Sequence, residues 1–341
     1  MLEYIKIGDT NLISSRIALG TWAIGGWMWG GTDEKESIRT IHAALDQGIN
    51  LIDTAPIYGF GRSEEIVGEA LRQHGRRESI IIATKVGLDW TNGKVERNST
   101  RQRILREIED SLHRLQTDHV DIYQVHWPDP VAPIEETAAT LRELYEQGKI
   151  RAIGVSNYSP EQMARFKTVA PIHTIQPPYN LFEREIERDV LPYALSQGIA
   201  ALTYGALCRG LLSGAMSADR RFGKDDLRKT SDPKFQQPHF AEYLDAANKL
   251  DAYAREHFGK RVIHLAVRWL LDQPGVGVAL WGARHPEQLA PIGEVSGWSL
   301  TKADFAAIDA ILRDSIRHPV GPEFMAPPAR ETDEPATVSA G

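Results

Sequence analysis

The chain has 341 residues, of which 42% are hydrophobic and 25% charged, a balance typical of a globular protein with a sizeable core. Its net charge of −7 gives no general attraction to nucleic acid or to an anionic membrane surface, so we expect neither as a partner. The single cysteine, Cys208, excludes an internal disulfide, and neither a membrane-length apolar run nor a signal peptide is evident, so a cytoplasmic location is expected.

Strands and helices are predicted to alternate along most of the chain. Residues 3–15 resemble a small hairpin that plugs or covers part of the main body. The expected strands that follow are 16–20, 49–53, 79–84, 120–125, 150–155, 173–176, 199–203 and 276–280. The expected helices between them are 33–48, 62–74, 101–115, 135–147, 160–168, 185–197 and 262–273.

Short, apolar strands without alternation, each separated from the next by a helix, indicate parallel pairing with both faces buried. Eight such strands predict an α/β fold, a closed (β/α)8 TIM barrel, here with an N-terminal β-hairpin and extra helices at 240–258 and 302–314. We expect residues 1–318 to form one barrel domain. The proline-rich remainder, 319–341, is predicted to be an extended or disordered tail.

Long irregular loops of a compact domain are usually functional, and the longest one here is the insertion 208–238 after the seventh strand. The loops 22–32, 87–100, 127–133 and 208–238 are therefore expected to set substrate selectivity. Tryptophans in two of them predict the walls of a substrate pocket, namely Trp22, Trp27, Trp29 and Trp127.

Four side chains of suitable chemistry follow or end three neighbouring strands: Asp53, Tyr58, Lys85 and His126. Because active sites of such barrels lie at the carboxyl ends of the strands, these four are predicted to share one pocket. A lysine ammonium next to a tyrosine is expected to lower the phenol pKa, with the aspartate orienting the lysine. The histidine would hydrogen-bond the substrate oxygen or the phenol, which completes a proton donor for a forming alkoxide.

Other motifs give weaker indications of function. Gly59-Phe-Gly61-Arg-Ser-Glu64 begins like a dinucleotide fingerprint, but Glu64 stands where the third glycine would be, which disfavours a Rossmann site. Cys208 has no evident base near it in sequence and is interpreted as a buried structural thiol. The histidines lack metal-ligand spacing, so no metal is expected.

The four residues belong to a longer ordered pattern. It consists of Asp53 and Tyr58, Lys85, Ser111-Leu-His-Arg-Leu115, Asp118-His-Val-Asp-Ile-Tyr-Gln-Val-His126 and Gly154-Val-Ser-Asn157. In these motifs and their spacing the chain resembles the aldo-keto reductase superfamily from Tyr4 to Leu312. The resemblance implies a nicotinamide-dependent oxidoreductase without a Rossmann domain, in which Tyr58 is the general acid, Lys85 and Asp53 tune it, and His126 orients the carbonyl.

The same resemblance implies where the cofactor is held. The matching positions are Gly20, Thr21, Trp22, Asp53, Ser156, Asn157, Gln176, Tyr204, Gly205, Leu207, Leu211, Gly214, Gly282, Ala283, Arg284 and Gln288. Of these, Arg284 suits the 2′-phosphate, which favours NADPH (NADP+) while NADH stays possible. Trp281 and Ile292 depart from the family's usual proline and asparagine at the adenosine end.

Two functions of different classes remain open at this point. The first is an enzyme that reduces an aldehyde or ketone to an alcohol. The alternative is a cofactor-binding regulatory module resembling potassium-channel β subunits, which retain the same four residues. The carbonyl substrate, sugar-like, steroid-like or xenobiotic, and the oligomeric state are not determined by the sequence.

Overall fold

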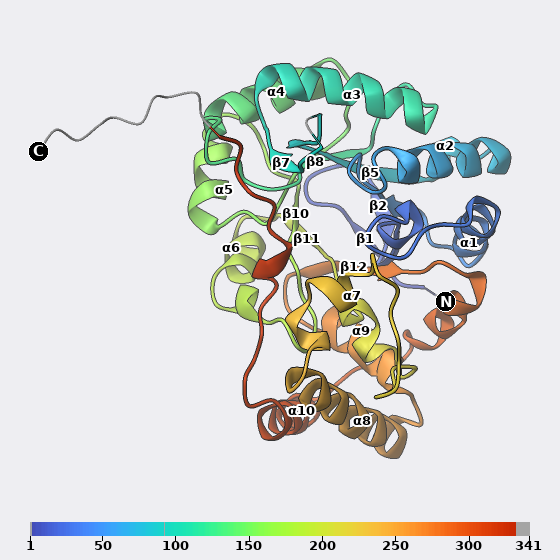
Figure 1. Cartoon of the computed structure of the whole chain (residues 1–341). Coiled ribbons are helices and arrows are strands. Elements are labelled where there is room, and N and C mark those ends of the chain that lie inside the picture. Colours follow the sequence, from blue (N-terminus) through green and yellow to red (C-terminus); the bar gives the residue numbers. More distant parts are fainter. Residues whose placement is uncertain (1, 92, 332–341) are drawn as a thin grey trace, which may run out of the picture.

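The computed structural model describes residues 2–91 and 93–331, and its centre is a barrel of parallel strands (Figure 1). Within that part of the chain, eight strands close in the cyclic order β3-β4-β5-β8-β9-β10-β11-β12. Their bounds are β3 Ile17–Gly20, β4 Leu51–Asp53, β5 Ile81–Val86, β8 Ile122–Val125, β9 Ile153–Ser156, β10 Thr174–Gln176, β11 Ala200–Thr203 and β12 Val276–Gly282. The predicted (β/α)8 barrel is confirmed.

The helices are arranged around the barrel of strands (Figure 1). They are α1 Glu34–Asp46, α2 Arg62–His74, α3 Arg101–Leu115, α4 Ile134–Glu146, α5 Pro160–Lys167, α6 Val190–Ser196, α7 Leu227–Thr230, α8 His239–Phe258, α9 Val262–Leu271 and α10 Lys302–Ser315. Among the described residues, none of these helices has the length and apolarity needed to cross a membrane.

Local sequence explains most helix boundaries. Thr100 caps α3 by accepting from the backbone N–H of Arg103, and Ser159 with Gln162 forms a reciprocal capping box at α5. The helix expected at 185–197 is instead a 3-10 turn, Glu185–Glu187, followed by α6. The Asp189 side chain accepts from the N–H of Val190, which starts a new helix there.

The N-terminal hairpin closes the end of the barrel where the strands begin. Its strands are β1 Tyr4–Lys6 and β2 Ile13–Ser15, paired antiparallel. Ile7 between them is fully buried and joins the apolar cluster inside the barrel with Ala18 and Leu51. The hairpin therefore acts as the plug that its position predicted, at the end opposite the predicted site.

The loop after β5 contains a second, unpredicted hairpin, β6 Leu88–Asp89 with β7 Glu96–Arg97. The insertion 208–238 contains short helical turns instead of one irregular loop: 3-10 helix η4 Cys208–Ser213, α7, and 3-10 helix η5 Pro233–Phe235. Neither hairpin nor turns follow a hydrophobic period long enough to be recognised in the sequence.

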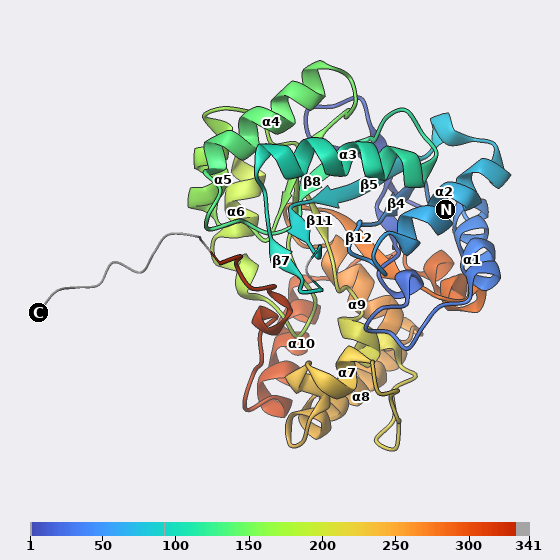
Figure 2. The same ribbon diagram turned by 45° about the horizontal axis from the view of Figure 1, so that its top comes forward.

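The segment after α10, expected to be an extended or disordered tail, is ordered against the barrel over its described part. From residue 319 to 331 it runs beside the carboxyl ends of the strands, with one 3-10 turn at Glu323–Met325 and a parallel bridge from Ala329 to Arg97 (Figure 2). Its contacts with the barrel, described below, hold it in place. The remaining part of the predicted tail, 332–341, lies outside the described residues.

Candidate active site

Lys85 is the centre of the four predicted residues. Its ammonium Nζ donates to Asp53 Oδ2 at 2.7 Å, to the backbone oxygen of Thr54 at 3.0 Å and to the Tyr58 hydroxyl at 3.2 Å. His126 follows the end of β8, and its ring centroid lies 5.9 Å from that of Tyr58, nearly perpendicular to it. The strand order β4-β5-β8 therefore brings the four side chains together, as predicted.

Asp53 is held from both sides of the barrel mouth. One carboxylate oxygen accepts from Lys85, and the other accepts from Gln176 Nε2 of β10 at 2.7 Å. The Asp53 and Lys85 side chains are 3% and 1% exposed, so water does not screen the pair. A buried ammonium with a directly bonded carboxylate is thereby fixed beneath the phenol.

Burial changes the protonation of this group more than the lysine does. The pKa of Tyr58 lies well above its ordinary value because of burial and, second, the nearby Asp53 carboxylate. The net shift is therefore opposite to the lowering expected from Lys85 alone, and burial also lowers the pKa of Lys85 against the pull of Asp53. Burial and the Lys85 charge hold the pKa of His126 well below its usual value. Phenol and imidazole are both neutral at physiological pH, and each has a proton to donate.

Two glycines allow the loop after β3 to lie directly on the loop that carries Tyr58. A Cβ on Gly25 would stand 2.5 Å from the Tyr58 carbonyl carbon, and one on Gly59 would stand 2.1 Å from the Gly25 oxygen. Only a chain without side chains at these points can make that approach. The contact places Trp22 against Tyr58, with ring centroids 6.2 Å apart and planes at 27°.

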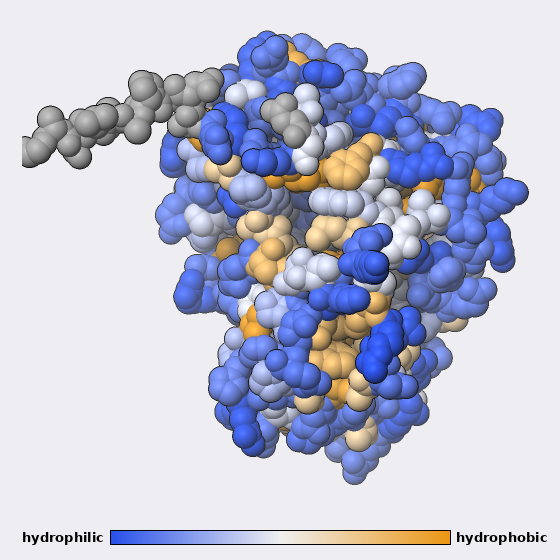
Figure 3. Space-filling model, viewed as in Figure 1, coloured by the Kyte–Doolittle hydropathy of each residue, from blue (hydrophilic) through white to orange (hydrophobic). Residues whose placement is uncertain are grey.

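A cavity of about 260 Å³ opens above Tyr58 and His126. Its lining is formed by Trp22, Trp27, Met28, Ile57, Tyr58, Leu88, Val95, His126, Trp127, Ser156, Asn157, Gln176, Tyr204, Leu227, Ser231, Phe324, Met325, Ala326, Pro327 and Pro328. These described lining residues include no Asp, Glu, Lys or Arg. Figure 3 shows apolar side chains gathered across the middle of this face, within a hydrophilic surround. The cavity suits an uncharged molecule.

Three of the four tryptophans predicted as pocket walls, Trp22, Trp27 and Trp127, line the cavity. Trp29 does not. It packs edge-on against Trp22, with ring centroids 5.4 Å apart, and the Arg228 guanidinium lies 5.1 Å from its ring. Trp29 therefore supports the wall from behind, a distinction that the spacing of the loop residues does not encode.

The segment 324–328 forms one wall that the sequence reasoning missed. Phe324 packs under two buried cations, with Arg209 at 5.4 Å and Lys234 at 5.7 Å from its ring centroid. Farther along, Arg97 Nε donates to the Pro327 oxygen at 2.7 Å, and Arg330 pairs with Asp129. The sequence signal that could have predicted this wall is the Phe324-Met325 pair, two adjacent large apolar residues within a polar, proline-rich stretch.

The residues predicted to hold the nicotinamide face the same cavity and already bond to one another. The Tyr204 hydroxyl donates to Asn157 Oδ1 at 3.0 Å, and Asn157 Nδ2 donates to Ser156 Oγ at 3.0 Å. Gln176 lies beside them with its amide nitrogen on Asp53. Amide and hydroxyl groups of both polarities next to an aromatic ring fit a planar carboxamide ring, so the donor set is compatible with the predicted cofactor.

Residues predicted for the rest of the cofactor lie away from this cavity. Gly205, Leu207, Leu211 and Gly214 belong to the turns after β11, and Gly20 and Thr21 form the end of β3 and the residue after it. Thr21 is buried, and its hydroxyl donates to the Asp53 backbone oxygen at 2.9 Å. Cys208 is buried, as interpreted from the sequence, and burial raises the pKa of its thiol to about 12.

The predicted adenosine end lies after β12. Gly282 and Ala283 lead into Arg284, whose guanidinium donates to the backbone oxygens of Trp29 at 2.8 Å and Gly31 at 2.5 Å. The Gln288 side chain accepts from the Arg284 backbone N–H at 2.7 Å, so it shapes this turn. The two departures from the family pattern, Trp281 and Ile292, are both buried.

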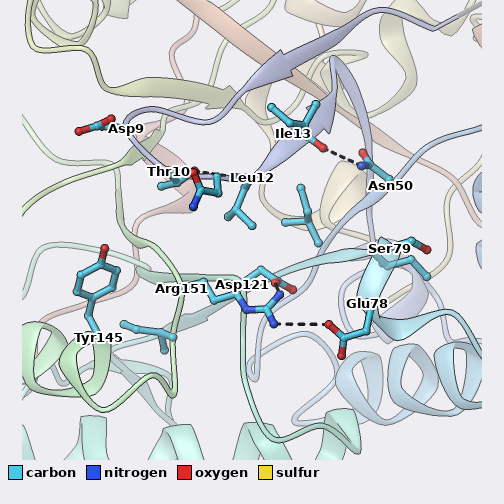
Figure 4. Close-up of a pocket in the computed structure, with 14 residues that line it drawn as sticks. Asp9, Thr10, Leu12, Ile13, Asn50, Glu78, Ser79, Asp121, Tyr145 and Arg151 are labelled. Atoms are coloured by element: carbon cyan, nitrogen blue, oxygen red, sulfur yellow. Dashed lines mark hydrogen bonds and ion pairs between the residues drawn. The ribbon is translucent and has the colours of Figure 1, made fainter.

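A second cavity, of about 650 Å³, lies at the opposite end of the barrel under the N-terminal hairpin (Figure 4). Asp9 in its lining pairs with Lys6, and the other three charged lining residues, Glu78, Asp121 and Arg151, form a network of ion pairs. Arg151 donates to Asp121 Oδ1 at 3.0 Å and faces Glu78 at 3.6 Å, while Asp121 also pairs with Arg77 at 2.9 Å. In neither cavity do the described residues gather three or more His, Cys, Asp or Glu side chains as a metal would need.

Comparison with known proteins agrees with this geometry. A model of the aldo/keto reductase family matches residues 16–313. The chain belongs to the aldo/keto reductase family. The aldo-keto reductase YhdN of Bacillus subtilis is 63% identical over 97% of this chain and 99% of its own length.

Two further similar proteins, one of them a solved structure, have names that describe an enzymatic reaction. The glycerol dehydrogenase AKR11B4 from Gluconobacter oxydans matches with a TM-score of 0.85 and 54% identity, covering 95% of this chain and 99% of that one. An NADH-specific methylglyoxal reductase of Escherichia coli is 35% identical over 89% of this chain and 96% of its own length. The relatives of this aldo-keto reductase thus include oxidoreductases of small oxygenated molecules.

Proposed function

We propose that this aldo-keto reductase reduces an aldehyde or ketone to an alcohol by hydride transfer, with Tyr58 as the general acid and NADPH as the cofactor. The observation that carries the proposal is the buried lysine between a carboxylate and a phenol. Lys85 Nζ stands 2.7 Å from Asp53 and 3.2 Å from the hydroxyl of Tyr58, which faces the cavity.

Each residue has a distinct part in the proposed reaction. When bound, the nicotinamide supplies the hydride. A neutral His126 donates a hydrogen bond to the carbonyl oxygen, and Tyr58 gives that oxygen its proton as negative charge develops on it. Lys85 donates to the phenol oxygen, so the phenolate left behind is stabilised at once by an ammonium that needs no reorientation. Asp53 keeps that ammonium oriented.

The cavity supports a small, uncharged substrate. Its volume of about 260 Å³ is below the range of drug-sized ligand sites, roughly 300–1,000 Å³. The lack of an acid or base of fixed charge among the described lining residues disfavours sugar phosphates and carboxylates. The names of the glycerol dehydrogenase and methylglyoxal reductase relatives fit a carbonyl of this kind.

The choice of NADPH rests on Arg284. Its guanidinium is oriented by two backbone oxygens, and burial with the nearby Arg228 charge lowers its pKa, so a neighbouring anion would stabilise its charged form. A 2′-phosphate would balance that charge. Because the E. coli relative at 35% identity is NADH-specific, NADH is the competing cofactor that the test must include.

The proposal is tested by turnover. We expect purified protein to oxidise NADPH in the presence of short aldehydes and α-dicarbonyls, and NADH more slowly, as followed by the loss of cofactor fluorescence. A panel of charged and uncharged carbonyls of equal size shows whether the charge or the size of a substrate determines which molecules the cavity accepts. Tight cofactor binding with no turnover on any carbonyl would favour the alternative, a cofactor-binding regulatory module.

A further inference from the structure

A second group of buried charges lies behind the active site, where α2 and α3 cover β5. Glu64 is fully buried and Glu107 is 1% exposed, yet neither lines the cavity. The Arg114 guanidinium pairs with both, at 2.6 Å and 3.1 Å, and Arg103 pairs with Glu107. Burying so many charges is costly unless each is paired, so their position calls for an explanation.

Glu64 connects this group directly to the strand that carries Lys85. Its carboxylate accepts from Arg114 through one oxygen and from the hydroxyl of Thr84 through the other, at 2.6 Å. Thr84 is the residue before Lys85 in β5. Glu64 itself lies in the first turn of α2, which begins just after the Tyr58 loop. One carboxylate therefore ties the Tyr58 side of the site to the Lys85 side.

The neighbouring Ser63 makes a similar connection to the other strands. Its hydroxyl bonds with Thr54 Oγ1 at 2.9 Å and with Thr21 Oγ1 at 2.7 Å, and the Thr54 backbone oxygen accepts from Lys85. The first turn of α2 thus fastens the ends of β3, β4 and β5 together. This arrangement explains why the short Ser-Glu pair follows the glycines of the Tyr58 loop.

The charge of Glu64 also acts on Lys85. Three groups face the ammonium at close range: Asp53 from β4, Tyr58 from the loop and His126 from the end of β8. Asp53 and, from behind, Glu64 favour the charged form of Lys85, in opposition to its burial.

Glu64 in turn faces Arg114 and Glu107 from α3 and Tyr123 from β8. Burial raises the pKa of Glu107 to about 7, with Glu64 adding to the effect. At alkaline pH Glu107 is already ionised, so it has no charge left to substitute for that of Glu64.

We propose that Glu64 is a positioning residue for the reaction, which holds Lys85 in place through Thr84 and keeps it charged from behind the site. The inference rests on the proposed roles of Lys85 and Tyr58. It differs from a purely structural role, in which Glu64 would only neutralise Arg114.

The test is Glu64→Gln, which keeps the size of the side chain. The variant loses a negative charge and leaves Arg114 less compensated, and both changes disfavour the ammonium of Lys85. We expect the alkaline limb of the kcat profile for carbonyl reduction to move to lower pH by on the order of one unit. At neutral pH, kcat should fall by about tenfold, while the dissociation constant for NADPH stays unchanged.

The matched control is Glu65→Gln in the next position. Glu65 is half exposed and pairs with Arg62 at the surface, so its variant should keep the wild-type limb and rate. A Glu64→Gln protein that melts at lower temperature but keeps the wild-type limb would overturn the inference, because a structural role alone predicts that result.

If Glu64→Gln does not fold, Thr84→Val decides the question. This variant keeps the charge of Glu64 and removes its bond to β5, so we expect a several-fold lower kcat with the alkaline limb unmoved. A wild-type kcat would overturn the inference. Failure of the proposed function is distinguished by Tyr58→Phe: full rate in this variant would remove the role proposed for Tyr58, whereas loss of activity would support that role and leave only the role of Glu64 to be tested.

Discussion

The two ends of the barrel each hold a cavity, and the proposed site lies in the smaller one. The cavity under the N-terminal hairpin has about 650 Å³, against about 260 Å³ at the carboxyl end. At the hairpin end, Arg151 pairs with Asp121 and Glu78, and the Glu78 side chain is 81% exposed (Figure 4). Solvent screens the exposed Glu78, and Asp121 has two arginine partners, so these charges are already compensated.

At the carboxyl end the same kinds of groups are buried beneath the cavity. The Lys85 side chain is 1% exposed and meets a phenol that faces the cavity, so its charge acts on whatever the phenol contacts. A charge in a dry environment interacts several times more strongly than one in water. Burial and the direction of the polar groups, more than volume, thus distinguish the proposed reactive cavity from the cavity under the hairpin.

The largest effect should come from the reactive end. Tyr58→Phe removes the proton donor but keeps the ring that packs on Trp22, so cofactor binding should persist. General acid catalysis contributes ~10²–10⁴ in rate, and kcat should fall by that amount. Single-turnover reduction with saturating NADPH measures it. Retention of most of the turnover would mean that another group donates the proton.

Lys85→Met should be nearly as damaging, with a diagnostic pH dependence. Burial and Asp53 already hold the Tyr58 pKa above its ordinary value, and loss of the ammonium removes the group that stabilises the phenolate. The pKa of Tyr58 should then rise further, because nothing opposes the effects of burial and Asp53. Alcohol oxidation needs the phenolate, so its residual rate should move to higher pH. Because the pair titrates together, the shift of the whole profile is the quantity to compare. An unmoved profile at full rate would remove Lys85 from the mechanism.

The fold and the reactive end were both accessible from the sequence. Strands such as 79–84 and 120–125 are apolar, short and separated by helices, and parallel order then puts Asp53, Lys85 and His126 side by side without further information. Four residues of matched chemistry at consecutive strand ends are also hard to explain by packing alone. The observed spacing of Lys85 to Asp53 and Tyr58 follows from this simple topology.

The parts that sequence reasoning missed depend on contacts between distant segments. The wall made by Phe324 depends on the buried Arg209 and Lys234, whose cations lie over its ring, and Trp29 turns away from the cavity because Arg228 lies over its ring. Neither packing follows a period of 2 or 3.6 residues. The raised pKa of Tyr58 was missed for the same reason, since burial is a property of the assembled fold and not of the Tyr–Lys pair.

A smaller effect is expected at the adenosine end. If Arg284 binds the 2′-phosphate, its charge-assisted hydrogen bonds contribute ~1.5–3 kcal/mol to NADPH alone, a preference of roughly 10- to 150-fold over NADH. Arg284→Ala should remove most of that preference by weakening NADPH only. Quenching of tryptophan fluorescence gives both dissociation constants.

Arg284 also donates to the backbone oxygens of Trp29 and Gly31, so the variant could weaken cofactor binding by disturbing that loop. Measuring both cofactors separates this effect from loss of the phosphate contact. Equal losses for NADPH and NADH would mean that the guanidinium serves only to hold that loop. Arg284→Lys keeps the charge but loses the planar fork, so it should retain part of the preference if the phosphate is bound.

The smallest effect should be found at the hairpin end, and it is the one that tests the contrast between the two cavities. Glu78 and Arg151 lie 3.6 Å apart with side chains 81% and 42% exposed, and Asp121 keeps Arg77 and Arg151 whether or not Glu78 is charged. An exposed pair of this kind contributes ~0–1 kcal/mol, so Glu78→Gln should change the free energy of unfolding by less than about 1 kcal/mol. Because the cavity there is at the opposite end from Tyr58, kcat and both cofactor dissociation constants should equal those of the wild type. Urea denaturation together with the carbonyl assay gives all three quantities. A several-fold change in kcat with unchanged stability would show that the hairpin end is coupled to the proposed active site. The larger cavity would then be relevant to function, against the contrast drawn above.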